Sequence, residues 1–342
     1  MHPWWVYAAF TAFVLVMLAL DLGVFNRKAH AVHPREAAIW TGVWVSLALL
    51  FSVGVGQLMG RQAALEFLAA WLVEKALSVD NIFVIVLIFG YFGVPARYQH
   101  RVLFWGILGA LVFRGAMIAV GSVLLEQFHW VLYIFGAFLV FTGIRMMRQT
   151  EREIDPETAP VLRLVRRFAP VTGEYHGSRF IIREPGPDGR MRRVLTPLFV
   201  VLITVETTDV IFALDSIPAV FAVTRDPFLV YTSNVFAILG LRSLYFLLAD
   251  VVQRFHLLKV GLGVVLVFVG AKMLAEDVVH VPVGISLAVI ALVIAGSVVL
   301  SIMFPREAKE PATRPVADTP PADDPPPAPI PDSDPGDTRR DA

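Results

Sequence analysis

The stretch that decides the fold class is residues 196–223, TPLFVVLITVETTDVIFALDSIPAVFAV. It exceeds the roughly 20 predominantly apolar residues that a helix needs to cross a bilayer. Lipid offers the backbone no hydrogen-bond partners, so a segment of this kind is expected to be helical. Three carboxylic acids, Glu206, Asp209 and Asp215, nevertheless lie near its middle. We therefore expect a transmembrane helix that carries buried acids, which in membrane proteins mark function.

The composition of the whole chain supports a membrane protein. Of 342 residues, 56% are hydrophobic and 17% are charged, and the mean hydropathy is +0.67. A soluble domain carries about 25% charged residues and covers its surface with them. The sequence contains no cysteine, which excludes disulfides, thiol redox chemistry and thiolate metal sites for this chain.

Similar apolar stretches recur along the sequence, and together they predict an all-α polytopic membrane protein with about nine transmembrane helices. The predicted spans are Trp4–Phe25, Glu36–Met59, Ala64–Phe92, Arg101–Leu125, Trp130–Met147, Thr196–Val223, Phe228–Asp250, Leu257–Leu274 and Pro282–Phe304. We expect residues 1–304 to form one transmembrane transporter domain with a long loop at 149–195. Residues 305–342 are rich in proline and aspartate and are expected to be a disordered tail.

Basic residues predict the orientation. Arginine and lysine concentrate in every second loop, most densely in 149–195, and follow the last span. By the positive-inside rule the N-terminus lies outside and the C-terminus is cytoplasmic. The positive-inside rule explains the arginines of 149–195, so we expect no nucleic acid as a partner. The predicted spans make the lipid bilayer the expected surroundings of the chain. That loop also contains a predicted hairpin, with Phe180–Arg183 and Met191–Leu195 on either side of a proline- and glycine-rich turn.

Spans three to five resemble spans six to eight. The matching pieces are Glu74 and Asp80-Asn81-Ile82 with Asp209 and Asp215-Ser216-Ile217, Phe113-Arg114-Gly115 with Leu241-Arg242-Ser243, and Gly143-Ile144-Arg145-Met146 with Gly270-Ala271-Lys272-Met273. Because each unit has three helices, the two units have opposite orientations in the membrane. Inverted repeats of three helices are a transporter architecture with substrate bound near the midplane. The alternative is chance similarity among apolar helices.

The polar residues of spans three and six form the candidate site. Carboxylate, amide and hydroxyl oxygens make a hard ligand set that suits Mn²⁺, Ca²⁺ or Mg²⁺. We expect Pro218 to interrupt its helix and to free a carbonyl beside Asp215. The candidate metal ligands are Glu74, Asp80, Asn81, Glu206, Asp209, Asp215 and Ser216.

Four further charged residues accompany these ligands as supporting charges: Lys75, Arg114, Arg242 and Asp21. The two arginines could replace the charge of a departing cation, which keeps the site neutral. Asp21 lies near the inner end of its span, where it could also simply face water. The alternative interpretation is that the acids pair with Arg114 and Arg242 to hold helices together.

Two stretches resemble the signature sequences of the TerC (tellurium-resistance protein C, including Alx) family. They are residues 74–84, EKALSVDNIFV, and residues 205–219, VETTDVIFALDSIPA. The early LDLGVF at residues 20–25 also fits that family. The resemblance implies an inner (plasma) membrane protein tied to manganese efflux, in some members induced by alkaline pH. A site lined by carboxylates would repel the tellurite anion that gave the family its name.

From the residues and the resemblance we predict a secondary transporter, not an enzyme. It would export Mn²⁺ or a similar divalent cation through the mid-membrane carboxylates, coupled to protons or to membrane potential, because no nucleotide motif is visible. We expect no permanently bound cofactor, and a homo-oligomer is left open. Two alternatives remain: an exporter of an amino acid or another small organic solute on a similar inverted repeat, and a non-transporting membrane scaffold linked to tellurite or stress resistance.

Overall fold

The computed structural model covers most of the membrane-embedded part of the chain. The described residues are 3–20, 34–148, 170–172, 175–185, 191–249, 257–279 and 281–304. The chain divides into two units, Met1–Arg306 and Glu307–Ala342, and every described residue belongs to the first. Asp21 and the LDLGVF segment after Leu20, much of loop 149–195 and the predicted tail at 305–342 lie outside the described residues.

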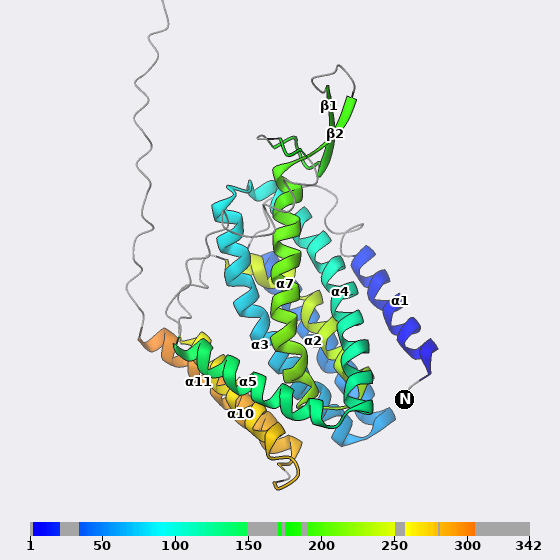
Figure 1. Cartoon of the computed structure of the whole chain (residues 1–342), viewed down its shortest axis with the longest axis vertical. Helices are drawn as coiled ribbons and strands as arrows, with labels where there is room; N and C mark the ends of the chain where they lie inside the picture. Colours follow the sequence, from blue (N-terminus) through cyan, green and yellow to red (C-terminus); the bar gives the residue numbers. More distant parts are fainter. Residues whose placement is uncertain are drawn as a thin grey trace, which may run out of the picture. The chain divides into compact units, whose positions relative to one another are not determined.

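Helices make up nearly all of the described chain (Figure 1). They are α1 (Trp4–Leu20), α2 (Pro34–Met59), α3 (Arg61–Tyr91), α4 (Ala96–Gln127), α5 (Trp130–Arg148), α7 (Pro197–Phe221), α8 (Pro227–Leu239), α9 (Leu241–Leu248), α10 (Leu258–Leu274) and α11 (Val283–Met303). The strands are β1 (Ile181–Pro185) and β2 (Met191–Leu195), which pair antiparallel with Ile181 opposite Leu195. The predicted hairpin is therefore confirmed.

Length and composition decide which helices qualify as membrane spans. Within the described ranges, α2, α4, α5, α7 and α11 are long and apolar enough, and α8 with α9 adds a sixth if the bent pair is one span. The helices α1 and α10 have only 17 residues each. The 31-residue α3 is long enough but carries charges at Glu66, Glu74, Lys75 and Asp80. The chain is a multi-pass integral membrane protein, while the count of nine spans and the inverted repeat stay predictions.

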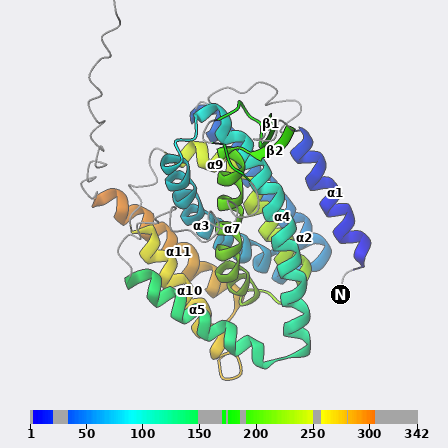
Figure 2. The same cartoon turned by 45° about the horizontal axis from the view of Figure 1, so that its top comes forward.

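The helix α3 holds the central position in the bundle. It packs against α2, α7, α8 and α11, and α4 packs against α7 and α8. Figures 1 and 2 show α3, α4 and α7 running alongside one another. Phe67 and Ile82 of α3 are fully buried in these contacts. Lipid is as apolar as such a core, so close van der Waals packing holds these helices together.

Two tight turns at the ends of α3 require glycine. Gly60 joins α2 to α3 with φ of 96°, and Gly93 follows α3 with φ of 58°. Both values lie in the left-handed region, which costs other residues roughly 1–2 kcal/mol. The turn at Gly60 reverses the chain so that α3 packs back against α2, and the turn at Gly93 leads the chain out of α3 toward α4.

The helices α5 and α10 form a closely packed pair that runs obliquely to α3 and α7 (Figure 1). Four glycines make the close approach possible. A Cβ atom added to Gly136 would lie 3.0 Å from the carbonyl oxygen of Gly270, and one on Gly143 would lie 2.6 Å from that of Gly263. Small residues that let backbones approach are typical of helix contacts in membranes.

The hairpin and the segment before it dock onto the ends of α3 and α4. Arg101 of α4 donates a hydrogen bond to Ser178 at 2.8 Å and lies 5.0 Å from the centre of the Phe180 ring. The phenol of Tyr175 donates to the backbone carbonyl of Phe92 at 2.7 Å. Burial raises the pKa of Tyr175, so this donor stays protonated at neutral pH. The described part of loop 149–195 is thus fixed to the helical bundle.

Candidate functional site

Three neighbouring helices supply most of the predicted site residues. Glu74, Lys75, Asp80 and Asn81 come from α3, Arg114 comes from α4, and Glu206, Asp209, Asp215 and Ser216 come from α7. The packing of α3 and α4 against α7 brings several of these side chains together. Arg242 lies half-buried on α9, and Asp21 lies outside the described residues.

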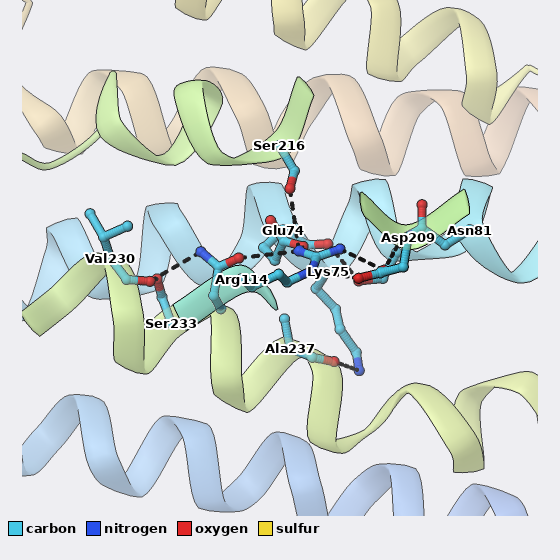
Figure 3. A network of polar contacts seen from close by, with 11 residues as sticks. Glu74, Lys75, Asn81, Arg114, Asp209, Ser216, Val230, Ser233 and Ala237 are labelled. Carbon is cyan, nitrogen blue, oxygen red and sulfur yellow. Dashed lines mark hydrogen bonds and ion pairs between the residues drawn. The ribbon is translucent and has the colours of Figure 1, made fainter. Parts of the chain in front are cut away.

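Arg114 is the centre of a buried polar network (Figure 3). Its guanidinium pairs with Glu74 of α3 and with Asp209 of α7. The contact with Asp209 is bidentate, with Nε to Oδ2 at 3.2 Å and Nη2 to Oδ1 at 3.0 Å. The side chain of Arg114 is 3% exposed and that of Glu74 is 0% exposed, so this charge network lies inside the bundle. Arg114 thus joins helices α3 and α7 through one shared cation.

The charges of this network do not balance if both acids are ionised. One guanidinium then faces two carboxylates, which leaves one negative charge uncompensated. The second oxygen of Glu74, Oε2, is buried without a hydrogen-bond partner among the described residues. A carboxylate in this environment costs several kcal/mol unless a cation or a proton neutralises it. With both acids ionised, one additional positive charge would therefore make the network of Arg114, Glu74 and Asp209 electrically neutral.

Neutral polar groups surround the same guanidinium. Ser216 accepts a hydrogen bond from Arg114 at 3.3 Å, and the amide oxygen of Asn234 accepts one at 3.2 Å. Asn81 donates its amide to Asp209 at 3.4 Å. Asn234 of α8 was missed by sequence reasoning, although Thr232-Ser233-Asn234 is a polar triplet within an apolar helix. The cluster thus offers hydroxyl and amide oxygens beside its carboxylates.

Glu206 lies outside the Arg114 network. Its carboxylate rests directly against the backbone of Gly109 on α4, where any added Cβ atom would overlap it. Its Oε2 atom is buried, and no residue in the described ranges forms a hydrogen bond with it. Asp209, three residues further along α7, shares this face of the helix. Glu206 is therefore a second acid that has no cation bonded to it in the described part of the chain.

Asp80 and Asp215 lie toward the α5–α10 pair. Thr142 of α5 donates a hydrogen bond to Asp215 at 3.3 Å. Asp80 lies within electrostatic range of Asp215 and of Lys259, which belongs to α10. Neither aspartate contacts Arg114 through a hydrogen bond. Four of the predicted acidic ligands thus form two groups, Glu74 with Asp209 around Arg114, and Asp80 with Asp215 beside α5 and α10, while Glu206 belongs to neither.

Two predictions about the site concern its geometry: the helix break at Pro218, which is wrong, and the metal ligands, which stay a prediction. The helix α7 continues past Pro218 to Phe221, so Pro218 does not interrupt it. The break lies instead between α8 and α9, which bend by 41° at Gly240. Within the described ranges, no three His, Asp or Glu side chains converge closely enough to hold a metal ion by themselves. Arg114 stands between two of the predicted ligands, so the role of these residues in metal binding stays a prediction.

Comparison with known proteins identifies the family. Residues 59–309 match the model of the integral membrane protein TerC family. The chain belongs to the TerC family. That match covers both acidic stretches, so the resemblance noted in the sequence is confirmed.

Curated relatives cover nearly the whole chain. An uncharacterized membrane protein of Myxococcus xanthus is 52% identical over 302 residues, which is 88% of this chain and 93% of the relative. A protein of Escherichia coli K12 named "Putative membrane-bound redox modulator Alx" is 48% identical over 293 residues, 83% of this chain and 90% of the relative. A membrane protein of Rickettsia bellii is 38% identical over 288 residues, with coverage of 84% and 94%. No solved structure matches this chain.

Proposed function

We propose that this member of the TerC family is a secondary transporter that exports Mn²⁺ or a similar divalent cation. The observation that carries the proposal is the sharing of Arg114 between Glu74 and Asp209, acids of two different helices, deep in the bundle. A divalent cation would compete with the guanidinium for the same carboxylates. The neutral oxygens of Ser216 and Asn234 lie beside them. Such an oxygen-only set suits Mn²⁺ better than a thiophilic metal.

The proposed cycle uses Arg114 as an internal counter-charge. When the cation binds, the guanidinium withdraws from Glu74 and Asp209, and when the cation leaves, the guanidinium returns. This exchange keeps a buried site from carrying several uncompensated negative charges, which lipid penalises strongly. Asp80, Asp215 and Glu206 then serve as further ligands or as proton acceptors, and protons or the membrane potential drive export. No bound cofactor and no catalytic step are part of this proposal, and it places the N-terminus outside and the C-terminus in the cytoplasm.

The test is Mn²⁺ transport by purified protein in vesicles. We expect Asp80→Asn and Asp215→Asn to abolish transport, because each removes a ligand charge while keeping the size of the side chain. Glu66→Gln is the matched control, since Glu66 is a carboxylate of the same α3 that contacts Thr224 at 2.6 Å and not the Arg114 network. Gln can still accept that hydrogen bond, so this variant should transport normally.

The outcomes separate the main proposal from its rivals. Undiminished Mn²⁺ transport by both aspartate variants would eliminate the site, and no Mn²⁺ transport by the unaltered protein would eliminate the function. An exporter of an organic solute would show no thermal stabilisation by Mn²⁺, and neither would a scaffold. The redox role in the printed name of several relatives is a further candidate. The 342 residues contain no cysteine, so such a role could not use thiols of this chain.

A further inference from the structure

The bend between α8 and α9 leaves a helix end inside the bundle. The helix α8 ends at Leu239, Gly240 follows, and α9 begins at Leu241 after a bend of 41°. The last carbonyl groups of a helix have no partner within it, and they carry the negative end of its dipole. In membrane transporters, such half-helix ends coordinate small cations. The end of α8 is therefore a natural position for a positive charge.

In this chain the positive charge is the ammonium group of Lys75. Its Nζ atom donates a hydrogen bond to the carbonyl oxygen of Ala237, in the last turn of α8, at 3.3 Å. Figure 3 shows the Lys75 side chain directed to Ala237, away from the cluster around Arg114. A Cβ atom added to Gly240 would lie 2.7 Å from Nζ, so the close approach of the ammonium depends on glycine at the bend.

Lys75 is a half-buried lysine of α3. No carboxylate in the part of the chain described here forms an ion pair with it, and the adjacent acid, Glu74, pairs with Arg114 instead. A charged side chain near the centre of a membrane is expensive and is normally paired or functional. The dipole of α8 and the carbonyl group of Ala237 are thus what the described structure offers to stabilise this ammonium group.

We propose that the C-terminal end of α8 is a monovalent-cation site that the chain fills with its own Lys75 ammonium. The tethered ammonium takes the position that a free inorganic cation such as Na⁺ would otherwise take, and it stabilises the bend between α8 and α9. The unaltered protein should accordingly need no Na⁺ for stability or transport. This inference concerns a position other than the carboxylate site and does not depend on the proposed export of Mn²⁺.

Chemical rescue tests the site directly. Lys75→Ala removes the ammonium and leaves its space open in the purified full-length protein. We expect its Tm to fall by about 5 °C or more in choline chloride. Methylammonium or Na⁺ at the same ionic strength should restore at least half of that loss by occupying the end of α8. The unaltered protein should show the same Tm in choline, Na⁺ and methylammonium chlorides.

Lys75→Met is the matched control, because methionine fills most of the space without a charge. Its Tm should also be lowered, but no cation should restore it. The inference is overturned if Na⁺ and methylammonium fail to stabilise Lys75→Ala, including the case in which the variant stays unfolded in their presence. It is equally overturned if they stabilise Lys75→Met to the same extent, since that would be a general salt effect. A Tm of the unaltered protein that rises specifically with Na⁺ would show that Lys75 does not fill the site.

Discussion

Replacing Asp209 should destabilise the protein, whereas replacing Asp80 should not. Asp209 accepts two hydrogen bonds from Arg114, at 3.2 and 3.0 Å, and a third from Asn81 at 3.4 Å. Asp209→Asn removes the charge and places an amide group against the guanidinium. Asp80 has no hydrogen bond within the described residues, so Asp80→Asn removes an expensive charge without breaking a network.

The contacts in the structure also give the expected difference in the free energy of unfolding between Asp209→Asn and Asp80→Asn. Breaking a buried ion pair costs about 3–5 kcal/mol, and a hydrogen bond to a charged group contributes about 1.5–3 kcal/mol. Because Glu74 still pairs with Arg114 in the variant, we expect Asp209→Asn to lose about 2–4 kcal/mol. Asp80→Asn should change the free energy of unfolding by less than about 1 kcal/mol in either direction.

Thermal unfolding of the detergent-purified protein measures this difference. With about 2–4 °C per kcal/mol, Asp209→Asn should lower the Tm by roughly 5–15 °C, while Asp80→Asn should stay within about 4 °C. Both variants should lose Mn²⁺ transport, so the pair separates loss of stability from loss of function. Equal Tm values for the two variants would refute the argument that Arg114 holds α3 and α7 together through Asp209.

Three further predictions follow from the same geometry. Gly143→Ala should destabilise the protein by about 1–3 kcal/mol, because the added Cβ atom would lie 2.6 Å from the carbonyl oxygen of Gly263 in the α5–α10 contact. Gly54→Ala is the control: an added Cβ atom there meets open space, so this variant should not lower the Tm. Thermal stabilisation by Mn²⁺ should grow as pH rises from about 6 to 8, because protons and metal compete for the same oxygens, and a response independent of pH would contradict that competition. Arg183→Cys in the hairpin should react with a membrane-impermeant thiol reagent from the cytoplasmic side alone, and labelling from outside would reverse the orientation.

The sequence predicted the positions of the helices well because a long apolar segment in lipid has to satisfy its own backbone hydrogen bonds and therefore forms a helix. A helix appears at each long apolar stretch, including those around Glu74 and Asp209, and the two strands of the predicted hairpin pair with each other. These features depend on local sequence: length, hydropathy and turn residues. Even so, α3 is too highly charged, and α1 and α10 are too short, to qualify as spans by length and composition. Whether a charged or short helix crosses the membrane depends on the helices that pack against it. The sequence pattern of the helix alone does not show those contacts.

The contacts of the candidate site could not be predicted in the same way. The sequence identified Arg114 and the acids of two helices, yet the choice of partners depends on how α3 and α4 both pack against α7. Glu74 and Asp209 share the arginine, whereas Asp215 contacts Thr142 of α5. The helix break was expected at Pro218 but lies at Gly240. A proline in the last turn of a helix removes one hydrogen bond without ending the helix, and a glycine at a close contact permits a bend that no local signal required.

The distribution of charge around the site supports a mobile cation more strongly than a purely structural role. If the acids served only to hold helices together, each would be expected to have a partner of its own. Arg114 is shared by two acids, and Glu206 has a buried oxygen that contacts no hydrogen-bond partner in the part of the chain that the structure describes. Lys75, which follows Glu74 in the sequence, points away to Ala237. Among the described residues, negative charge therefore stays uncompensated beside α4, and a proton or a bound metal ion can neutralise it. A structural role predicts that Glu206→Gln leaves Mn²⁺ transport intact, whereas the carrier proposed here should lose or uncouple it.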